Sequence, residues 1–197
     1  MSIYKTRQLL VDCAREIFAR QGFDATTMND IALASGKGRR TLYTYFKNKE
    51  EIYEAVISTE LERMSERMDD LCKQPLTPIE KILTLVYTHL AMMKETVSRN
   101  GSLRAEFFRN IWLVERVRRK LDVEEKGVIL HMLEEGVERG DFEVESLPLM
   151  ADIILYSIKG LEVPYIYDRI GEGLGDMESQ KIVTNILSRV LLKGGKK

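Results

Sequence analysis

Apolar residues recur at helical intervals along most of the chain. Near the N-terminus they stand at Leu10, Ala14, Ile17 and Phe18, which are positions i, i+4, i+7 and i+8 of one helix face. Similar stripes predict further helices over residues 48–73, 78–98, 102–121, 124–139, 146–170 (containing Pro164) and 177–192. Because no segment shows the two-residue alternation of a strand, the pattern predicts an all-α protein.

Short polar and glycine-containing breaks divide the first 48 residues into three helices. Gly22 follows the first stripe, where a left-handed residue is expected to end the helix. Thr26 or Thr27 can cap the second helix, and Ser35-Gly36 can end it. The third helix is predicted from about Gly38 to Tyr45. Two short helices joined by a glycine turn are typical of a helix-turn-helix.

The third helix has two chemically different faces. Leu42 and Phe46, four residues apart, are expected to point into the core. Arg39 and Arg40 lie on or beside the outer face, where each can pair with guanine or neutralise a phosphate. Thr41, Tyr43 and Thr44 share that side, and the threonines can contact a thymine methyl group or a phosphate. The helix therefore predicts a DNA-reading element.

The N-terminal segment resembles the DNA-binding domain of TetR-family transcriptional regulators. The resemblance covers about residues 4–57. Its matching positions are Ile17-Phe18, Gly22-Phe23, Ala25-Thr26-Thr27, Ile31-Ala32, Ser35-Gly36, Thr41-Leu42-Tyr43-Thr44-Tyr45-Phe46 and Lys49-Glu50. Lys37, Gly38 and Arg40 depart from the usual family pattern, so the base pairs that relatives read cannot be transferred to this chain.

The resemblance adds roles that composition alone does not give. It implies that the hydroxyl groups of Tyr43 and Tyr45 bind the DNA backbone; the alternative is that their rings pack on the first helix. Lys49 is similar to a phosphate clamp at the start of the fourth helix, and Thr27 is a second phosphate candidate. The predicted DNA-binding set is Thr27, Lys37, Arg39, Arg40, Thr41, Tyr43, Thr44, Tyr45 and Lys49.

A helix of some 25 residues, capped by Asn48, is expected to link the two parts of the chain. We predict a helix-turn-helix domain at residues 1–48 and a helical ligand-binding and dimerisation domain at residues 49–197. The family resemblance implies a small-molecule pocket in the second domain. The ligand candidates are His89, Met93, Phe108 and Trp112, although each is more often a core or interface residue than a ligand contact.

The last two predicted helices carry wide apolar stripes. By the family resemblance these helices form a four-helix dimer interface with their twofold mates. The alternative is that they cover the core of their own chain. The interface candidates are Leu149, Ile153, Ser157, Leu161, Ile182, Ile186 and Val190.

Charge distribution supports a DNA-binding head. The net charge of the chain is only −1, but residues 1–50 carry 9 Lys and Arg against 5 Asp and Glu, a balance of +4. After Asp30, the charged residues up to Lys49 are all positive. A basic head on an acidic body concentrates attraction for a polyanion at one end of the chain.

Other classes of protein lack their usual signatures. Cys13, Cys72 and the two histidines do not have the spacing of a zinc site, and we expect reduced thiols in a cytoplasmic protein. Gly171, Gly173 and Gly175 follow no strand, so they are expected to connect helices rather than bind a nucleotide. We predict no cofactor, no metal, no enzymatic activity and no membrane span.

Together these patterns predict a homodimeric regulator, in the repressor sense, that binds a palindromic double-stranded DNA operator and leaves it when a small apolar or aromatic effector binds. One alternative is a DNA-organising protein without a regulatory role. Another is a small helical enzyme or binding protein whose head is incidental, or a regulator whose effector recruits DNA rather than releasing it. Operator selectivity and salt dependence separate these classes.

Overall fold

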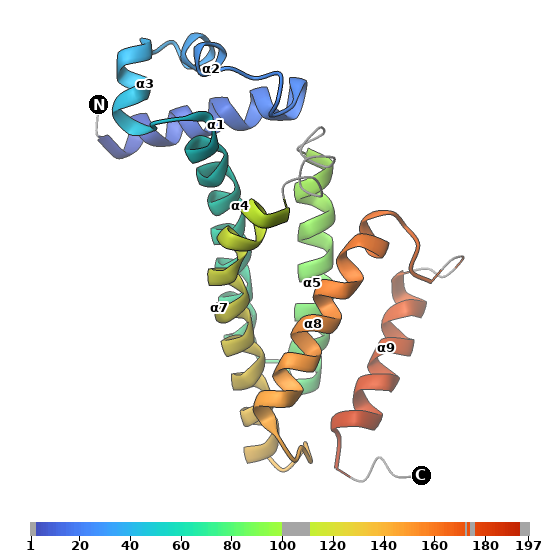
Figure 1. Ribbon diagram of the computed structural model, residues 1–197. Helices are drawn as coiled ribbons and strands as arrows, with labels where there is room; N and C mark the ends of the chain where they lie inside the picture. Colours follow the sequence, from blue (N-terminus) through green and yellow to red (C-terminus); the bar gives the residue numbers. More distant parts are fainter. Residues whose placement is uncertain (1–2, 100–110, 172, 174–175, 194–197) are drawn as a thin grey trace. The chain divides into compact units, whose positions relative to one another are not determined.

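The chain folds into α-helices throughout the part that can be described. The computed structural model describes residues 3–99, 111–171, 173 and 176–193, and these ranges contain no β-strand, only an isolated bridge between Phe142 and Leu192. The all-α prediction is confirmed. The helices are α1 (Ile3–Gln21), α2 (Met28–Ala34), α3 (Arg39–Tyr45), α4 (Lys49–Cys72), α5 (Pro78–Arg99), α7 (Ile111–Glu138), α8 (Leu147–Ile166) and α9 (Asp176–Leu191) (Figure 1).

Local signals fix the ends of the first helices. Gly22 follows α1 with φ 89°, a left-handed conformation that glycine adopts without steric cost. Thr27 is the N-cap of α2, and Ser35 is its C-cap. Gly36 then takes φ 62° in the turn before α3. The predicted three-helix head is therefore present, with helix ends close to those expected.

An aromatic cluster forms the centre of the head. The rings of Phe18 from α1 and Phe23 from the following turn lie 5.6 Å from the ring of Tyr53 and 4.9 Å from it, respectively. Tyr53 belongs to α4, so the first turns of α4 complete the core of the head. Leu42 and Phe46 are buried as the sequence predicts.

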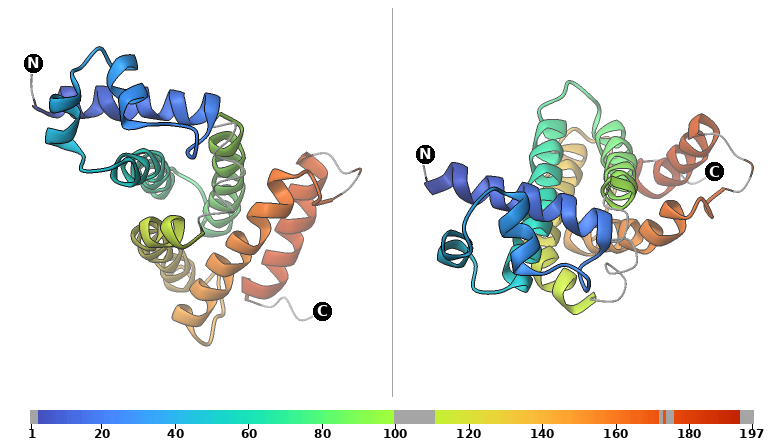
Figure 2. Two further views of the ribbon diagram at one scale, coloured as in Figure 1. Left: turned by 45° about the horizontal axis from the view of Figure 1, so that its top comes forward. Right: turned by 90° about the horizontal axis from the view of Figure 1, so that it is seen from above.

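The chain divides into two compact units. The first contains residues 1–63 with 95–119, and the second contains residues 64–94 with 120–197. In the second unit, α8 and α9 run antiparallel (Figures 1 and 2). Its core is formed by side chains from each of its helices, among them Met64, Met68, Ile82, Leu85, Met93, Ile129, Leu133, Leu155, Ile158 and Leu191.

Two predicted helix boundaries were wrong. The expected break between residues 121 and 124 is absent, because α7 runs without interruption from Ile111 to Glu138. No glycine or proline stands at that point, and Lys120 pairs with Glu124 across it at 3.7 Å. Helix α8 continues through Pro164 but ends at Ile166, earlier than residue 170, and Asp168 then adopts φ 53°.

A membrane span is not found in the described part of the chain. None of its helices combines the length and the apolar character that crossing a bilayer requires.

Candidate functional site

The outer face of α3 presents cationic and hydroxyl side chains. Leu42 anchors the helix in the core, and α2 packs against both α1 and α3. Arg39 and Arg40 are exposed in the first turn of α3, and Tyr43 and Thr44 are exposed one turn later. This arrangement can offer guanidinium and hydroxyl groups to one groove of DNA while the opposite face holds the helix rigid.

Three other DNA-binding candidates are less accessible. Lys37, Thr41 and Tyr45 are half-buried. Tyr45 lines a groove of about 520 Å³ between α1 and α4, in which the acidic residues Glu51, Glu54 and Glu62 also lie. The Thr44 hydroxyl donates a hydrogen bond to the Arg40 carbonyl at 2.9 Å, as threonine often does within a helix.

Thr27 forms a reciprocal cap with Asp30. The Thr27 backbone N–H and its hydroxyl each donate to the Asp30 carboxylate at 2.8 Å, and the Thr27 hydroxyl accepts from the Asp30 N–H. The hydrogen bond from the Thr27 side chain is the main cause that lowers the pKa of Asp30. While this capping box is formed, the hydroxyl proton is not available for a phosphate.

Lys49 is tied to the turn after α1. Its ammonium donates to the Phe23 carbonyl at 2.6 Å and to the Asp24 carbonyl at 3.4 Å, and it lies 4.2 Å from the centre of the Phe23 ring. These contacts hold the start of α4 against the head. A phosphate-binding role for Lys49 would therefore compete with a structural one.

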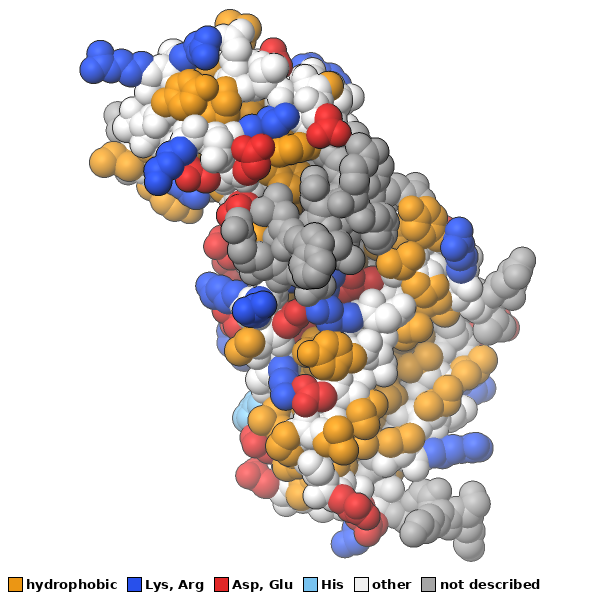
Figure 3. Space-filling view, viewed as in Figure 1, with side chains coloured by type: hydrophobic (Ala, Val, Ile, Leu, Met, Phe, Trp, Pro, Cys, Tyr) orange, Lys and Arg blue, Asp and Glu red, His pale blue; other side chains and the backbone are white. Residues whose placement is uncertain are grey.

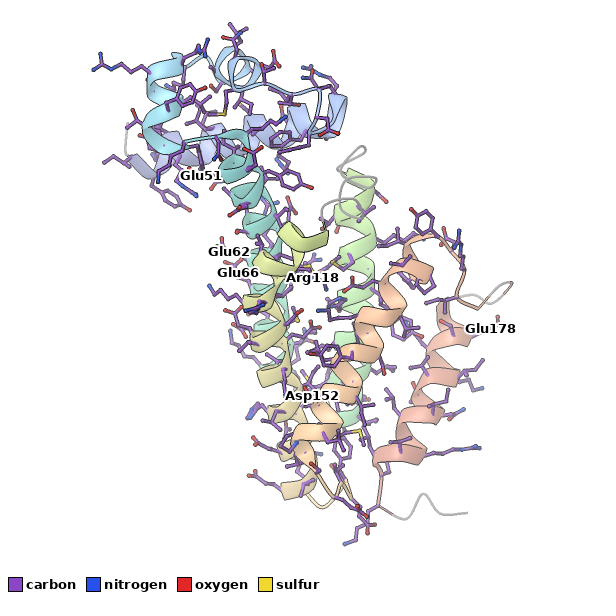
Figure 4. All side chains as sticks on the ribbon, in the orientation of Figure 1. Glu51, Glu62, Glu66, Arg118, Asp152 and Glu178 are labelled. Carbon is purple, nitrogen blue, oxygen red and sulfur yellow. The ribbon has the colours of Figure 1, made fainter. Side chains whose placement is uncertain are left out.

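The start of α4 carries a second reciprocal cap. The Asn48 side chain accepts from the Glu51 N–H at 2.8 Å, and the Glu51 carboxylate accepts from the Lys47 N–H at 2.7 Å. Figure 4 shows Glu51 in this first turn. The cap expected at Asn48 is confirmed, and it fixes where the linking helix begins.

In the second unit, His89 bridges three helices. Its Nδ1 lies 2.8 Å from Glu125 Oε1 of α7, and its Nε2 lies 2.8 Å from Glu162 Oε1 of α8. All three side chains are buried. Burial alone would lower the pKa of His89, but the hydrogen bonds and charges of both carboxylates outweigh it and raise the pKa to about 9. The ring is therefore an imidazolium at neutral pH, with both N–H groups already used.

The other ligand candidates are placed differently. Met93 is buried on α5. Trp112 lies in the first turn of α7, but its side chain is outside the described atoms, and Phe108 lies outside the described residues. The ligand assignment for these four positions remains a prediction.

A cavity of about 490 Å³ lies in the second unit between α5, α8 and α9. Its walls include Val86, Leu90 and Val183, while Lys94 and Asp168 form an ion pair among its lining residues. None of the four predicted ligand residues lines it. The volume falls in the range of small-molecule pockets.

The predicted dimer-interface residues share an exposed surface on α8 and α9. All seven are exposed in the single chain, with Leu149 at 60% and Ile186 at 57% of full accessibility. Figure 3 shows hydrophobic side chains gathered over these helices. Because Leu149, Ile153, Ile182, Ile186 and Val190 are all large and apolar, they form the kind of surface that a folded chain usually covers.

Sequence comparison identifies the head. The family model of bacterial regulatory proteins, tetR family, matches residues 10–56. Over most of its length the chain is similar to the HTH-type transcriptional regulator YhgD of Bacillus subtilis (strain 168), with 24% identity over 162 residues, 82% of this chain and 83% of that protein. The chain belongs to the TetR family of transcriptional regulators.

Two further TetR-like relatives have names that mention fatty acids. The fatty acid metabolism regulator protein of Bacillus subtilis (strain 168) is 30% identical over 84 residues, which is 43% of each chain. The structure of the transcriptional regulator FadR from Bacillus subtilis in complex with stearoyl-CoA has a TM-score of 0.65 and 21% identity, covering 92% of this chain and 96% of that one. At this identity the structural likeness establishes the shared fold.

Sequence reasoning selected His89 in this TetR-family chain but missed its two partners. Glu125 follows Leu121 and precedes Ile129 at four-residue intervals on α7, and all three are buried. Glu162 occupies the same kind of position between Ile158 and Ile166 on α8. A glutamate that replaces an apolar residue within a buried stripe was the available signal, because buried carboxylates are rare unless they are paired.

The raised pKa of His89 predicts a pH-dependent stability. The pKa is about 9 in the folded chain and 6.5 for an unperturbed histidine, so protonation stabilises the folded state. This contribution is complete below pH 6.5 and is lost as the pH rises towards 9. We expect the free energy of unfolding to fall by about 3 kcal/mol across that interval.

Urea unfolding at a series of pH values measures this change. The His89→Leu variant is the reference, because it lacks the titrating ring but keeps the other ionisable groups. A constant difference in stability between the two proteins from pH 6.5 to 9 would contradict the assignment.

Proposed function

We propose that this TetR-family chain is a homodimeric repressor that binds a palindromic operator and leaves it when a small effector with an apolar or aromatic body binds. Within this proposal residues 1–48 read DNA, and residues 49–197 bind the effector and form the dimer. The protein acts in the cytoplasm and is not an enzyme. The observation that carries the proposal is the exposed face of α3, with Arg39, Arg40, Tyr43 and Thr44 on a helix anchored by Leu42.

The proposed DNA contacts divide into two groups. Arg39 and Arg40 are assigned to base edges or adjacent phosphates, because a guanidinium can pair bidentately with either. Thr41, Tyr43, Thr44 and Tyr45 are assigned to the DNA backbone and thymine methyl groups. Lys37 adds positive charge at the turn. Thr27 and Lys49 are assigned to phosphate only where DNA replaces their present partners, Asp30 and the Phe23 carbonyl.

The exposed apolar face of α8 and α9 supports the homodimer. A twofold pairing through that face would give the complex two copies of α3, and a palindromic operator has matching half-sites. Such half-sites are about 34–36 Å apart when the two helices enter successive major grooves on one side of the duplex.

Effector control rests on the connection between the two parts. The same helix, α4, contributes Tyr53 to the core of the head and Met64 and Met68 to the second unit. We infer that an effector bound among the helices of the second unit changes the position of α4, and with it the separation of the two α3 helices. The stearoyl-CoA in the FadR structure supports an effector with a long apolar part.

Replacement of Arg39 tests the DNA-reading role. After the operator has been selected from random DNA, we expect Arg39→Ala to weaken its binding by about 1–3 kcal/mol and to relax selectivity at one base pair if Arg39 reads a base. Fluorescence anisotropy with operators that differ at single positions measures both effects.

Arg119→Ala is the matched control, because Arg119 is an exposed arginine of α7. Uniform weakening on all sequences would assign Arg39 to a phosphate instead. If the wild-type protein prefers its selected site by less than about a thousandfold over random DNA, a DNA-organising role would replace the regulatory one.

A further inference from the structure

We propose that the cavity between α5, α8 and α9 binds an amphipathic anion, whose acidic head replaces Asp168 at Lys94 and whose apolar body lies against Val86, Leu90 and Val183. This inference deepens the proposed function, because the bound molecule would be the effector. The site differs from the four ligand positions predicted from the sequence.

The face of α5 that lines the cavity is apolar in the middle and polar at both ends. Val86, Leu90 and Lys94 follow one another at four-residue intervals, and Tyr87 precedes Lys94 by seven residues. Two helical turns separate Tyr87 from Lys94, which is about 10 Å along the axis. The cavity therefore suits a ligand with a body of about that length and a polar group at one end or both.

The opposite walls have matching chemistry. Helix α8 supplies Leu161 and Tyr165, and α9 supplies Val183 and Ser179. The Tyr87 and Ser179 hydroxyl groups are 3.1 Å apart and hydrogen-bonded, so the end of the cavity away from Lys94 is closed by a pair of neutral polar groups. An aliphatic chain between the two ends would contact apolar side chains from three helices.

The charged end favours an anion over a cation. Lys94 and Asp168 are the charged side chains that line the cavity, and they pair with each other. The Lys94 side chain is 37% exposed, whereas that of Asp168 is 78% exposed. An ion pair with so exposed a carboxylate contributes little to stability, so Asp168 can leave at low cost. Lys94, whose ammonium also lies 5.5 Å from the Tyr165 ring centre, remains to bind the incoming head.

The position of the cavity suggests how its occupant would act. Leu161 lines the cavity and also belongs to the predicted dimer interface. Both α8 and α9 therefore contribute side chains to the cavity and to the exposed apolar face. A ligand that fills the space between these helices would alter the surface through which the two subunits are proposed to pair.

Three probes of equal chain length test the head-group preference. Decanoate, decanol and decylamine are titrated into the full-length protein in a calorimeter, below the concentrations at which they form micelles. We expect decanoate to bind most tightly and decylamine most weakly. Decanoyl-CoA is added as a fourth probe: tighter binding than decanoate would assign the head to a thioester conjugate, and weaker binding to a free acid.

Two variants locate the binding. Lys94→Met should weaken decanoate by roughly 10- to 100-fold, the effect of one charge-assisted hydrogen bond, and leave decanol unchanged. Val183→Phe, which fills part of the cavity, should weaken both ligands. Lys126→Met is the control, because Lys126 is also 37% exposed and paired with an aspartate, Asp152, but does not line the cavity.

The proposal is overturned if decanoate binds no better than decanol, or if Lys94→Met and Lys126→Met bind decanoate equally well. A separate operator-binding assay distinguishes this failure from failure of the proposed function. Binding of decanoate that depends on Lys94 but leaves operator affinity unchanged would support the site and contradict effector-driven release. Release of DNA by another compound, with Lys94→Met unaffected, would do the reverse.

Discussion

Replacement of His89 with leucine is expected to lower the free energy of unfolding by about 3–5 kcal/mol. The substitution leaves the buried carboxylates of Glu125 and Glu162 without the imidazolium that each contacts at 2.8 Å. Their charges would then be neither paired nor hydrated. Urea unfolding of the wild-type and variant proteins at neutral pH, followed by circular dichroism, measures the difference.

His131→Leu is the matched control for this experiment. His131 lies on α7 but is exposed, so its replacement is expected to change stability by no more than about 0.5 kcal/mol. A second variant, with His89, Glu125 and Glu162 all replaced by leucine, should recover much of the lost stability, because a well-packed apolar cluster often replaces a buried ionic one without loss. Equal unfolding midpoints for His89→Leu and the wild type would contradict the buried bridge.

Placing a charge on the apolar face of α8 and α9 should separate the proposed dimer. Ile153 and Ile186 are 50% and 57% exposed in the single chain, and the double variant Ile153→Glu/Ile186→Glu would bury four like charges in a twofold interface. We expect a monomer in sedimentation experiments. Operator affinity should fall by about 10²–10⁴-fold, because each head would then bind its half-site independently.

Val137→Glu is the control for the interface variant. Val137 is 39% exposed on α7, outside the predicted interface, so this protein should remain dimeric and should bind the operator normally. A double variant that stays dimeric at micromolar concentration would show that the subunits pair through another surface. Monomers that still bind the full operator as tightly as the wild type would contradict the twofold reading model.

The head was predictable from the sequence because its signals are local. Gly22, Thr27 and Ser35 each mark a helix end through the conformation or hydrogen bonding of a few neighbouring residues. The burial of Leu42 and Phe46 followed from their spacing on a short helix. What spacing could not give was the present occupation of candidate groups: the Thr27 hydroxyl caps α2, and the Lys49 ammonium binds carbonyl groups.

The second unit was less predictable because its sites join distant segments. His89 and Glu162 are 73 residues apart, so their hydrogen bond depends on how α5 packs against α8. The cavity depends on the same packing and on the position of α9. The missing break in α7 has a different cause: the polar residues Asp122 and Glu124 suggested a helix end, whereas Asp122 pairs with Lys159 at 2.6 Å and Glu124 accepts from Ser65 at 2.8 Å.

The bridge at His89 also links helix movement to protons. A neutral imidazole has one N–H and can donate to only one of the two carboxylates, so the bridge in its present form requires the protonated ring. If α5 moved away from α7 or α8, the ring would lose an acceptor and its affinity for the proton would fall. Rearrangement of these helices is therefore accompanied by proton exchange with the surrounding buffer.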